Sequence, residues 1–204
     1  CINSAFYWVL TGYNKIIILE RLGATYNGNY AVASKFAIVL TLISSAFSMA
    51  WQELAYGKSS TDKRTGEFYS NATNEYYKML FCGSIIIIPI ISIIYPFFID
   101  KSYYAAKEII PIYILATVLS IFSTFLGSIL TSYKKTNIIF VSTLVASIVN
   151  IILLYVSIDK LGLISAPFSL LIGYAVNCLI RILIIKRTID YNFDFVMNIY
   201  MITL

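Results

Sequence analysis

The amino-acid sequence predicts an all-α fold, a multi-pass integral membrane bundle of helices. Of the 204 residues, 59% are hydrophobic and 12% are charged, whereas soluble domains have about 45–50% apolar and about 25% charged residues. Too few polar side chains are present to cover the surface of a protein in water. At roughly 30 residues for each transmembrane helix and its connection, the chain has room for about six or seven spans.

Six spans can be placed from the positions of the charged residues. The last four contain the uncharged runs 79–99, 109–133, 136–158 and 161–180, each bounded by Lys, Arg, Asp or Glu and long enough to cross the hydrocarbon core of a bilayer. The first two are less pure, because polar residues interrupt them. The six expected helices cover residues 2–20, 30–56, 78–99, 105–131, 136–158 and 162–187.

Residues 1–189 are therefore expected to form one six-helix lobe. A short hydrophilic turn follows, and the apolar run within 190–204 is interpreted as the start of a seventh, truncated helix. The longest polar stretch, at 57–78, is too hydrophilic to span a membrane and too short to fold alone. It is predicted to be an interfacial loop with one or two amphipathic turns.

The basic residues predict the orientation of the lobe, because cytoplasmic loops of membrane proteins are enriched in Lys and Arg. With six alternating spans, nine basic residues fall on one side of the membrane and four on the other. The richer side, which includes loop 57–78, is expected to be cytoplasmic. Its basic residues are Lys58, Lys63, Arg64, Lys78, Lys134, Lys135, Arg181, Lys186 and Arg187, and the other side has Arg21, Lys101, Lys107 and Lys160.

Several classes of chemistry lack the residues that they require. The chain has no histidine, which excludes His-based catalysis and His ligation of a metal or haem. Its three cysteines, Cys1, Cys82 and Cys178, are far apart in apolar contexts and are interpreted as small hydrophobic residues. No phosphate-binding glycine loop, nucleophile elbow or zinc-protease motif is present. We therefore expect no enzymatic activity, no metal, no cofactor and no nucleic-acid partner.

Three charged residues within the first two spans, Lys15, Lys35 and Glu53, are candidates for a substrate path. A charge at the centre of a span costs about 2.5–3.5 kcal/mol on insertion scales, so such groups commonly face a polar cavity. A second interpretation is that the long lysine stems, and the position of Glu53 near a helix end, let these charges reach the membrane interface. Lys35 and Glu53 are 18 residues apart, which places them on one helix face about 27 Å from each other.

Amide side chains add polar groups to other spans. Asn14, beside Lys15, and Asn150 are further candidates for the substrate path, because amides in hydrocarbon require a hydrogen-bonding partner or water. An ammonium group in a polar cavity suits an anionic group such as a phosphate. Arg181 is close to the cytoplasmic end of the last span and is expected to anchor that helix at the interface.

Six short stretches, taken in their order along the chain, carry a family resemblance. They are YNKIIIL at 13–19, GNYAVASKFA at 28–37, AFSMAW at 46–51, YYAA at 103–106, SIVNIIL at 147–153 and KLGLISA at 160–166. Together they resemble the second half of polysaccharide-biosynthesis flippases of the O-antigen (Wzx) type. The resemblance extends over nearly the whole chain, and the order and spacing of the stretches make it more specific than any one of them.

The resemblance implies a transporter of the multidrug/oligosaccharidyl-lipid/polysaccharide superfamily, which is MATE-like and has two six-helix lobes. This chain would be the second lobe and the start of the next helix. Such proteins move undecaprenyl-diphosphate-linked repeat units of O-antigen or capsule across the bacterial inner membrane. The implied partners are this lipid-linked oligosaccharide, membrane lipids and other polysaccharide-assembly proteins.

The resemblance also implies a mechanism, in which two lobes rock and expose the cavity between them to each side in turn. Lys35 and Lys15 would attract the diphosphate, with Glu53 and Asn14 as supporting polar groups. The family commonly carries an Asp-Arg pair where this chain has Asn14 and Lys15, so the acidic member is missing. Coupling to a proton or sodium gradient through that position is therefore not implied. A usual glycine of the family is replaced by Ser165.

Three other functions fit part of the sequence. A drug or cation antiporter would be favoured by acidic residues within its spans, and this lobe has only Glu53 there. A membrane enzyme such as a repeat-unit polymerase would need a large outer loop or a cluster of acids in a loop, whereas the expected outer connections are short. A non-transporting membrane scaffold fits the composition equally well, but its deletion need not cause lipid-linked repeat units to accumulate.

Overall fold

The structure, a computed structural model, describes residues 2–57 and 65–188. The expected truncated helix at 190–204 lies outside the described residues. The described part of the chain forms six long helices and two short 3₁₀ helices, which connect α3 to α4 and α5 to α6. Their bounds are α1 Ile2–Arg21, α2 Ala24–Gly57, α3 Thr65–Phe98, η1 Lys101–Tyr103, α4 Ala105–Ser132, α5 Thr136–Leu161, η2 Gly162–Ile164 and α6 Ser165–Thr188.

The predicted all-α membrane fold is confirmed. The two described ranges contain no strand. Within them, four helical segments are long and apolar enough to cross a membrane, and the last of these contains both α5 and α6. The segments are Ala24–Glu53, Gly66–Phe98, Ala105–Ser132 and Thr136–Arg187.

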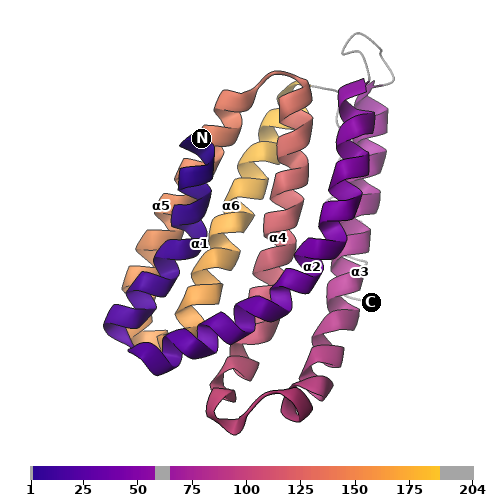
Figure 1. Ribbon diagram of the computed structural model, residues 1–204. Coiled ribbons are helices and arrows are strands. Elements are labelled where there is room, and N and C mark those ends of the chain that lie inside the picture. The colour runs from indigo at the N-terminus through magenta and orange to yellow at the C-terminus, as the bar shows by residue number, and fades with distance from the viewer. Residues whose placement is uncertain (1, 58–64, 189–204) are drawn as a thin grey trace.

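Helix α6 lies between α4 and α5, and these three helices pack side by side (Figure 1). Helix α1 lies along α5 and runs in the same direction. Helix α2 starts beside the end of α1, crosses the bundle obliquely and continues along α4, and aromatic side chains join it to α3. Helix α3 packs on α4 at the edge of the bundle. Helix α4 is the most extensively buried of these helices, because it packs on α2, α3 and α6, and α6 is covered by α4 and α5 on two sides.

The expectation of a loop at 57–78 is wrong for its second half. Helix α3 begins at Thr65, thirteen residues before the expected start of the span at 78. Residues at helical spacing on this part of α3, among them Tyr69, Thr73, Tyr76 and Leu80, are buried. Asn71 and Glu75, which lie between them, are exposed on the other face, so this segment is an amphipathic extension of the span rather than a loop.

The connection between α3 and α4 is a short turn with its own cap. Asp100 precedes η1, and its Oδ1 accepts a hydrogen bond of 2.9 Å from the backbone N–H of Ser102. Bonds from the backbone and side chain of Ser102 lower the pKa of the exposed Asp100 carboxyl below its ordinary value. Because the folded-state pKa is lowered, this contribution to stability is present above the ordinary pKa and is lost as the pH falls through the lowered one.

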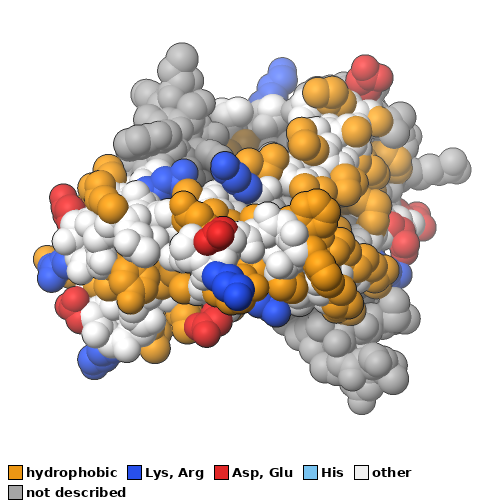
Figure 2. Space-filling model, turned by 60° about the horizontal axis from the view of Figure 1, so that its bottom comes forward, with side chains coloured by type: hydrophobic (Ala, Val, Ile, Leu, Met, Phe, Trp, Pro, Cys, Tyr) orange, Lys and Arg blue, Asp and Glu red, His pale blue; other side chains and the backbone are white. Residues whose placement is uncertain are grey.

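Large hydrophobic side chains cover much of the outer surface of α2 and α3. Examples are Leu42 and Met49 on α2 and Ile93 and Phe97 on α3, all of which are exposed. Figure 2 shows the lower end of the bundle, where Lys, Arg, Asp and Glu side chains are scattered among hydrophobic ones. An apolar circumference with charged ends is the surface that a lipid bilayer requires.

An aromatic cluster joins α2, α3 and α4. Trp51 of α2 is 5% exposed, and its ring stacks on Phe68 of α3 and packs against Phe125 of α4, with centroid distances of 5.6 and 4.7 Å. Its indole Nε1 donates a hydrogen bond of 2.9 Å to Ser128 Oγ on α4. Trp51 therefore satisfies its polar atom while filling the space between three helices.

We predict that Trp51→Ala lowers the free energy of unfolding by about 3–5 kcal/mol, because it leaves a cavity between three helices. Phe97→Ala is the control, since Phe97 is 81% exposed and its loss should cost less than about 1 kcal/mol. Unfolding in detergent micelles measures both. Equal losses for the two variants would contradict the packing described here.

Candidate functional site

Two of the predicted substrate-path residues lie together in the interior. Asn14 of α1 and Asn150 of α5 are fully buried. Asn150 Nδ2 donates a hydrogen bond of 2.9 Å to Asn14 Oδ1, and Asn14 Nδ2 donates one of 3.2 Å to the carbonyl oxygen of Ala166 on α6. Side-chain hydrogen bonds thus connect α1, α5 and α6 at one level of the bundle.

A buried tyrosine extends this group to two more helices. Tyr30 of α2 is fully buried, and its ring packs edge to face on Tyr113 of α4 with a centroid distance of 5.3 Å. Its hydroxyl lies near Asn14, and it interacts electrostatically with the buried Tyr174 of α6. Five helices therefore contribute to one polar group, which we call the Asn14 centre: the buried Asn14, Tyr30, Asn150 and Tyr174 and the partly buried Tyr113.

The sequence of α6 explains how polar side chains come to lie inside an apolar bundle. Every fourth residue from Ser165 to Ile185 is buried, which places a row of small and polar residues on one face. Gly173 belongs to this row, and a Cβ atom there would lie 3.1 Å from the Ala146 carbonyl oxygen and 3.2 Å from Asn150 Cβ. The missing side chain lets α5 approach closely, which brings Asn150 into the interior.

Lys15 lies outside the Asn14 centre, although it follows Asn14 directly. Consecutive residues of an α-helix are about 100° apart around its axis, so the two side chains leave α1 on different faces. Asn14 is buried and Lys15 is exposed. The hydrogen bonds of Asn14 fix the rotation of α1 and thereby the direction in which Lys15 points.

Lys35 and Glu53 are exposed on the outer face of α2. The buried face of this helix includes Tyr30, Ala33 and Leu40, and Lys35 lies nearly opposite to it at 3.6 residues per turn. The residues that share the outer face with Lys35, such as Leu42, are apolar and exposed. The three predicted charged residues therefore belong to outward-facing surfaces of α1 and α2, and the two predicted amides belong to the interior.

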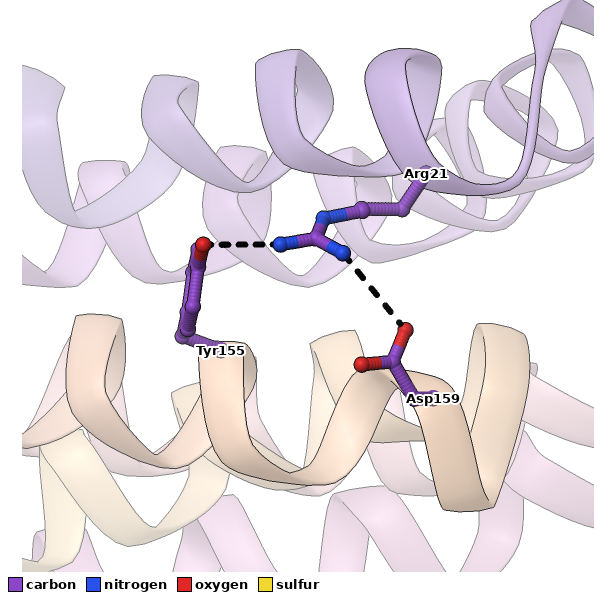
Figure 3. Close-up of polar contacts among 3 residues, drawn as sticks. All are labelled: Arg21, Tyr155 and Asp159. Carbon is purple, nitrogen blue, oxygen red and sulfur yellow. Dashed lines mark hydrogen bonds and ion pairs between the residues drawn. The ribbon is translucent and has the colours of Figure 1, made fainter.

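At the end of α1, Arg21 contacts two residues of α5 (Figure 3). Arg21 Nη2 donates a hydrogen bond of 2.7 Å to the Tyr155 hydroxyl, and the guanidinium carbon lies 4.9 Å from the centre of the Tyr155 ring. Arg21 Nη1 is 4.0 Å from Asp159 Oδ1. Both charged side chains are largely exposed, so this contact contributes little to stability. It continues the parallel contact between α1 and α5 beyond the Asn14 centre.

The expectation that Arg181 anchors α6 at the interface is wrong. Arg181 is 5% exposed, and it is the one buried charged residue in the part of the chain that the structure describes. Its Nε donates to Ser142 Oγ and its Nη2 to Thr143 Oγ1, each at 3.0 Å, on α5. Its Nη1 donates to the carbonyl oxygen of Ser123 on α4.

The position of Arg181 near the end of the span does not predict that it is buried, but the four-residue repeat of α6 does. Arg181 is the fifth member of the row that begins with Ser165, and the row also includes Asn177. A row in which polar and small residues recur every four positions predicts a helix face turned toward other helices. A basic residue in that row is therefore directed to the interior rather than to lipid.

The chemistry of these groups is that of hydrogen bonding and charge recognition. The Asn14 centre consists of amides and phenols, which are neutral at ordinary pH. No group of three His, Cys, Asp or Glu side chains that could hold a metal ion occurs among the described residues. Every carboxylate within the described ranges is exposed: Glu20, Glu53, Glu67, Glu75, Asp100, Glu108 and Asp159.

A double-mutant cycle tests the Asn14 centre. Asn14→Leu and Asn150→Leu should each lower the free energy of unfolding by about 1–3 kcal/mol, because each leaves a buried amide without its partner. The double variant should cost less than the sum, with a coupling of about 0.6–1.7 kcal/mol. Lys15→Leu is the matched control beside Asn14 and should cost no more than about 0.5 kcal/mol. Strictly additive losses would mean that the two amides do not interact.

Comparison with known proteins adds no assignment to this geometry. No protein-family model, curated protein or solved structure matches the chain. The features that bear on function are therefore its own: a membrane helix bundle, a neutral polar centre where five helices meet, and lysines on outward-facing surfaces of α1 and α2.

Proposed function

We propose that this chain is one lobe of a membrane transporter that moves undecaprenyl-diphosphate-linked oligosaccharide, such as O-antigen or capsule repeat units, across the bacterial inner membrane. The second lobe would pack opposite the outward-facing surfaces of α1 and α2. The proposal combines the likeness of six sequence stretches to O-antigen flippases with the placement of the charged residues.

The observation that carries the proposal is the exposure of Lys35. Its side chain points away from the core of the lobe, on a helix face that is otherwise apolar around Val39 and Leu42. An ammonium group on such a face costs about 2.5–3.5 kcal/mol in hydrocarbon. A water-filled cavity between two lobes removes that cost, and a diphosphate in the cavity would pair with the ammonium group.

The signs of the charges favour an anionic substrate over a cationic one. Lys15 and Lys35 are both exposed on helices that would face the cavity, and the acid on the same face of α2, Glu53, lies about five turns from Lys35. A drug or cation antiporter would use carboxylates that face this cavity, and the one acid on the outer face of α2 is Glu53, near the end of the helix. The diphosphate of a lipid-linked sugar fits this distribution.

The mechanism would be alternating access by rocking of the two lobes, with the lipid tail remaining in the bilayer. In this lobe the Asn14 centre would hold α1 and α2 on α4, α5 and α6 during the movement. Lys15 and Lys35 would thereby keep their directions relative to each other, and the diphosphate would meet the same two ammonium groups from either side.

The proposal predicts that Lys35→Ala in the full protein lowers export of repeat units by about 10- to 100-fold, the loss expected for one charge-assisted contact to phosphate. Lys35→Arg should retain most of the activity, because it keeps the positive charge. The measurements are the amount of surface polysaccharide and the amount of lipid-linked repeat unit that accumulates in the membrane.

Lys101→Ala is the control, since Lys101 is an exposed lysine of η1 at the end of the lobe. It should leave export unchanged. If Lys35→Ala matches this control at equal expression, Lys35 only anchors α2 at the interface, and the proposed charge recognition is rejected.

A further inference from the structure

We propose that Arg181 is an internal clamp that fixes the axial height of α5 relative to α4 and α6, so that these three helices move as one rigid body. This inference concerns the movement of the helices and does not depend on which substrate the protein carries.

The clamp has its donors on α6 and its acceptors on two other helices. On α5, Arg181 Nε and Nη2 reach Ser142 Oγ and Thr143 Oγ1 at 3.0 Å, and Nη2 also lies 3.5 Å from the Ile139 carbonyl oxygen. On α4, Nη1 reaches the Ser123 carbonyl oxygen. The guanidinium is planar and its donors have fixed directions. Displacement of α5 by one helical turn, about 5.4 Å, would break all the hydrogen bonds between Arg181 and α5.

Gly127 of α4 provides the space for the guanidinium. A Cβ atom at Gly127 would lie 2.9 Å from Arg181 Nη1, which is too close for an unstrained contact. The glycine lies one turn beyond Ser123, whose carbonyl oxygen accepts the bond. Helix α4 is thus shaped to receive this particular side chain.

The hydroxyl acceptors of the clamp do not need Arg181 in order to be satisfied. Ser142 Oγ and Thr143 Oγ1 donate to the Ile139 carbonyl oxygen at 3.0 and 2.7 Å within α5. Removal of the guanidinium therefore leaves no unpaired hydroxyl proton, whereas removal of the hydroxyls leaves a buried cation short of acceptors. These two changes should have unequal effects, because an unsatisfied buried charge is the more costly defect.

The first test measures the height of α5 directly. Spin labels at Lys107→Cys on α4 and Val141→Cys on α5 occupy exposed sites, about 30 Å apart along the bundle. They are placed in the full protein with Cys1 and Cys82 replaced by serine. Electron–electron double resonance should give one narrow distance in this background. Arg181→Met should at least double the width of the distance distribution, whereas Arg187→Met, at an exposed arginine of the same helix, should not.

Gly127→Ala provides the same test with Arg181 retained. Alanine normally stabilises a helix relative to glycine, so broadening here would come from displacement of the guanidinium. Gly83→Ala is its control, because a Cβ at Gly83 meets no atom within 4 Å. Unchanged widths for Arg181→Met and Gly127→Ala would overturn the clamp, and an unchanged width for Gly127→Ala would do so even if Arg181→Met fails to fold.

The second test compares the loss of the guanidinium donor with the loss of its hydroxyl acceptors, which should differ in cost. Ser142→Ala combined with Thr143→Val should lower Tm by roughly 5–10 °C, more than Arg181→Met does. Addition of Arg181→Met to that pair should restore most of the loss, because it removes the unsatisfied charge. Absence of this rescue would show that Arg181 is not held as a buried cation by these hydroxyls.

Discussion

The structure depends on the hydrogen bonds of α6 with its neighbours. In a bilayer the lipid tails are as apolar as the helices, so contact between apolar surfaces gives little preference for one arrangement of helices. Close approach and internal hydrogen bonds must provide that preference. Helix α6 supplies both, through Gly173 against α5, through the Ala166 carbonyl oxygen that binds Asn14, and through Arg181.

These contacts divide the polar groups of the lobe into two sets with different tasks. Inside, Asn14, Asn150 and Arg181 have hydrogen-bonding partners and connect helices. Outside, Lys15 and Lys35 are exposed on α1 and α2. The inner set determines how the helices are arranged, and the outer set is available to a substrate. In the proposed transporter, the rigid inner set would fix the positions of the outer residues Lys15 and Lys35.

The charge pattern predicts the fold class and the axial position of most helices, because uncharged length is what a bilayer requires. It misplaces the start of α3, since the segment from Thr65 is polar on average and becomes helical through its buried Tyr69 and Tyr76 face. It also fails for Arg181, because position along a span does not tell which face of the helix meets other helices. The hydrogen bond between Asn14 and Asn150 depends on the parallel packing of α1 on α5, which cannot be predicted from a local sequence pattern.

The burial of Arg181 as a hydrogen-bonded cation is the central claim, and proton exchange at its side chain tests it most directly. In protein labelled with ¹⁵N-arginine, the side-chain Nε–H groups of the arginines give signals in nuclear magnetic resonance spectra. The signal that Arg181→Met removes is that of Arg181. We predict that this Nε–H exchanges with water much more slowly than that of the exposed Arg187, because it donates to Ser142 Oγ in the interior. Exchange as fast as that of Arg187 would contradict the account.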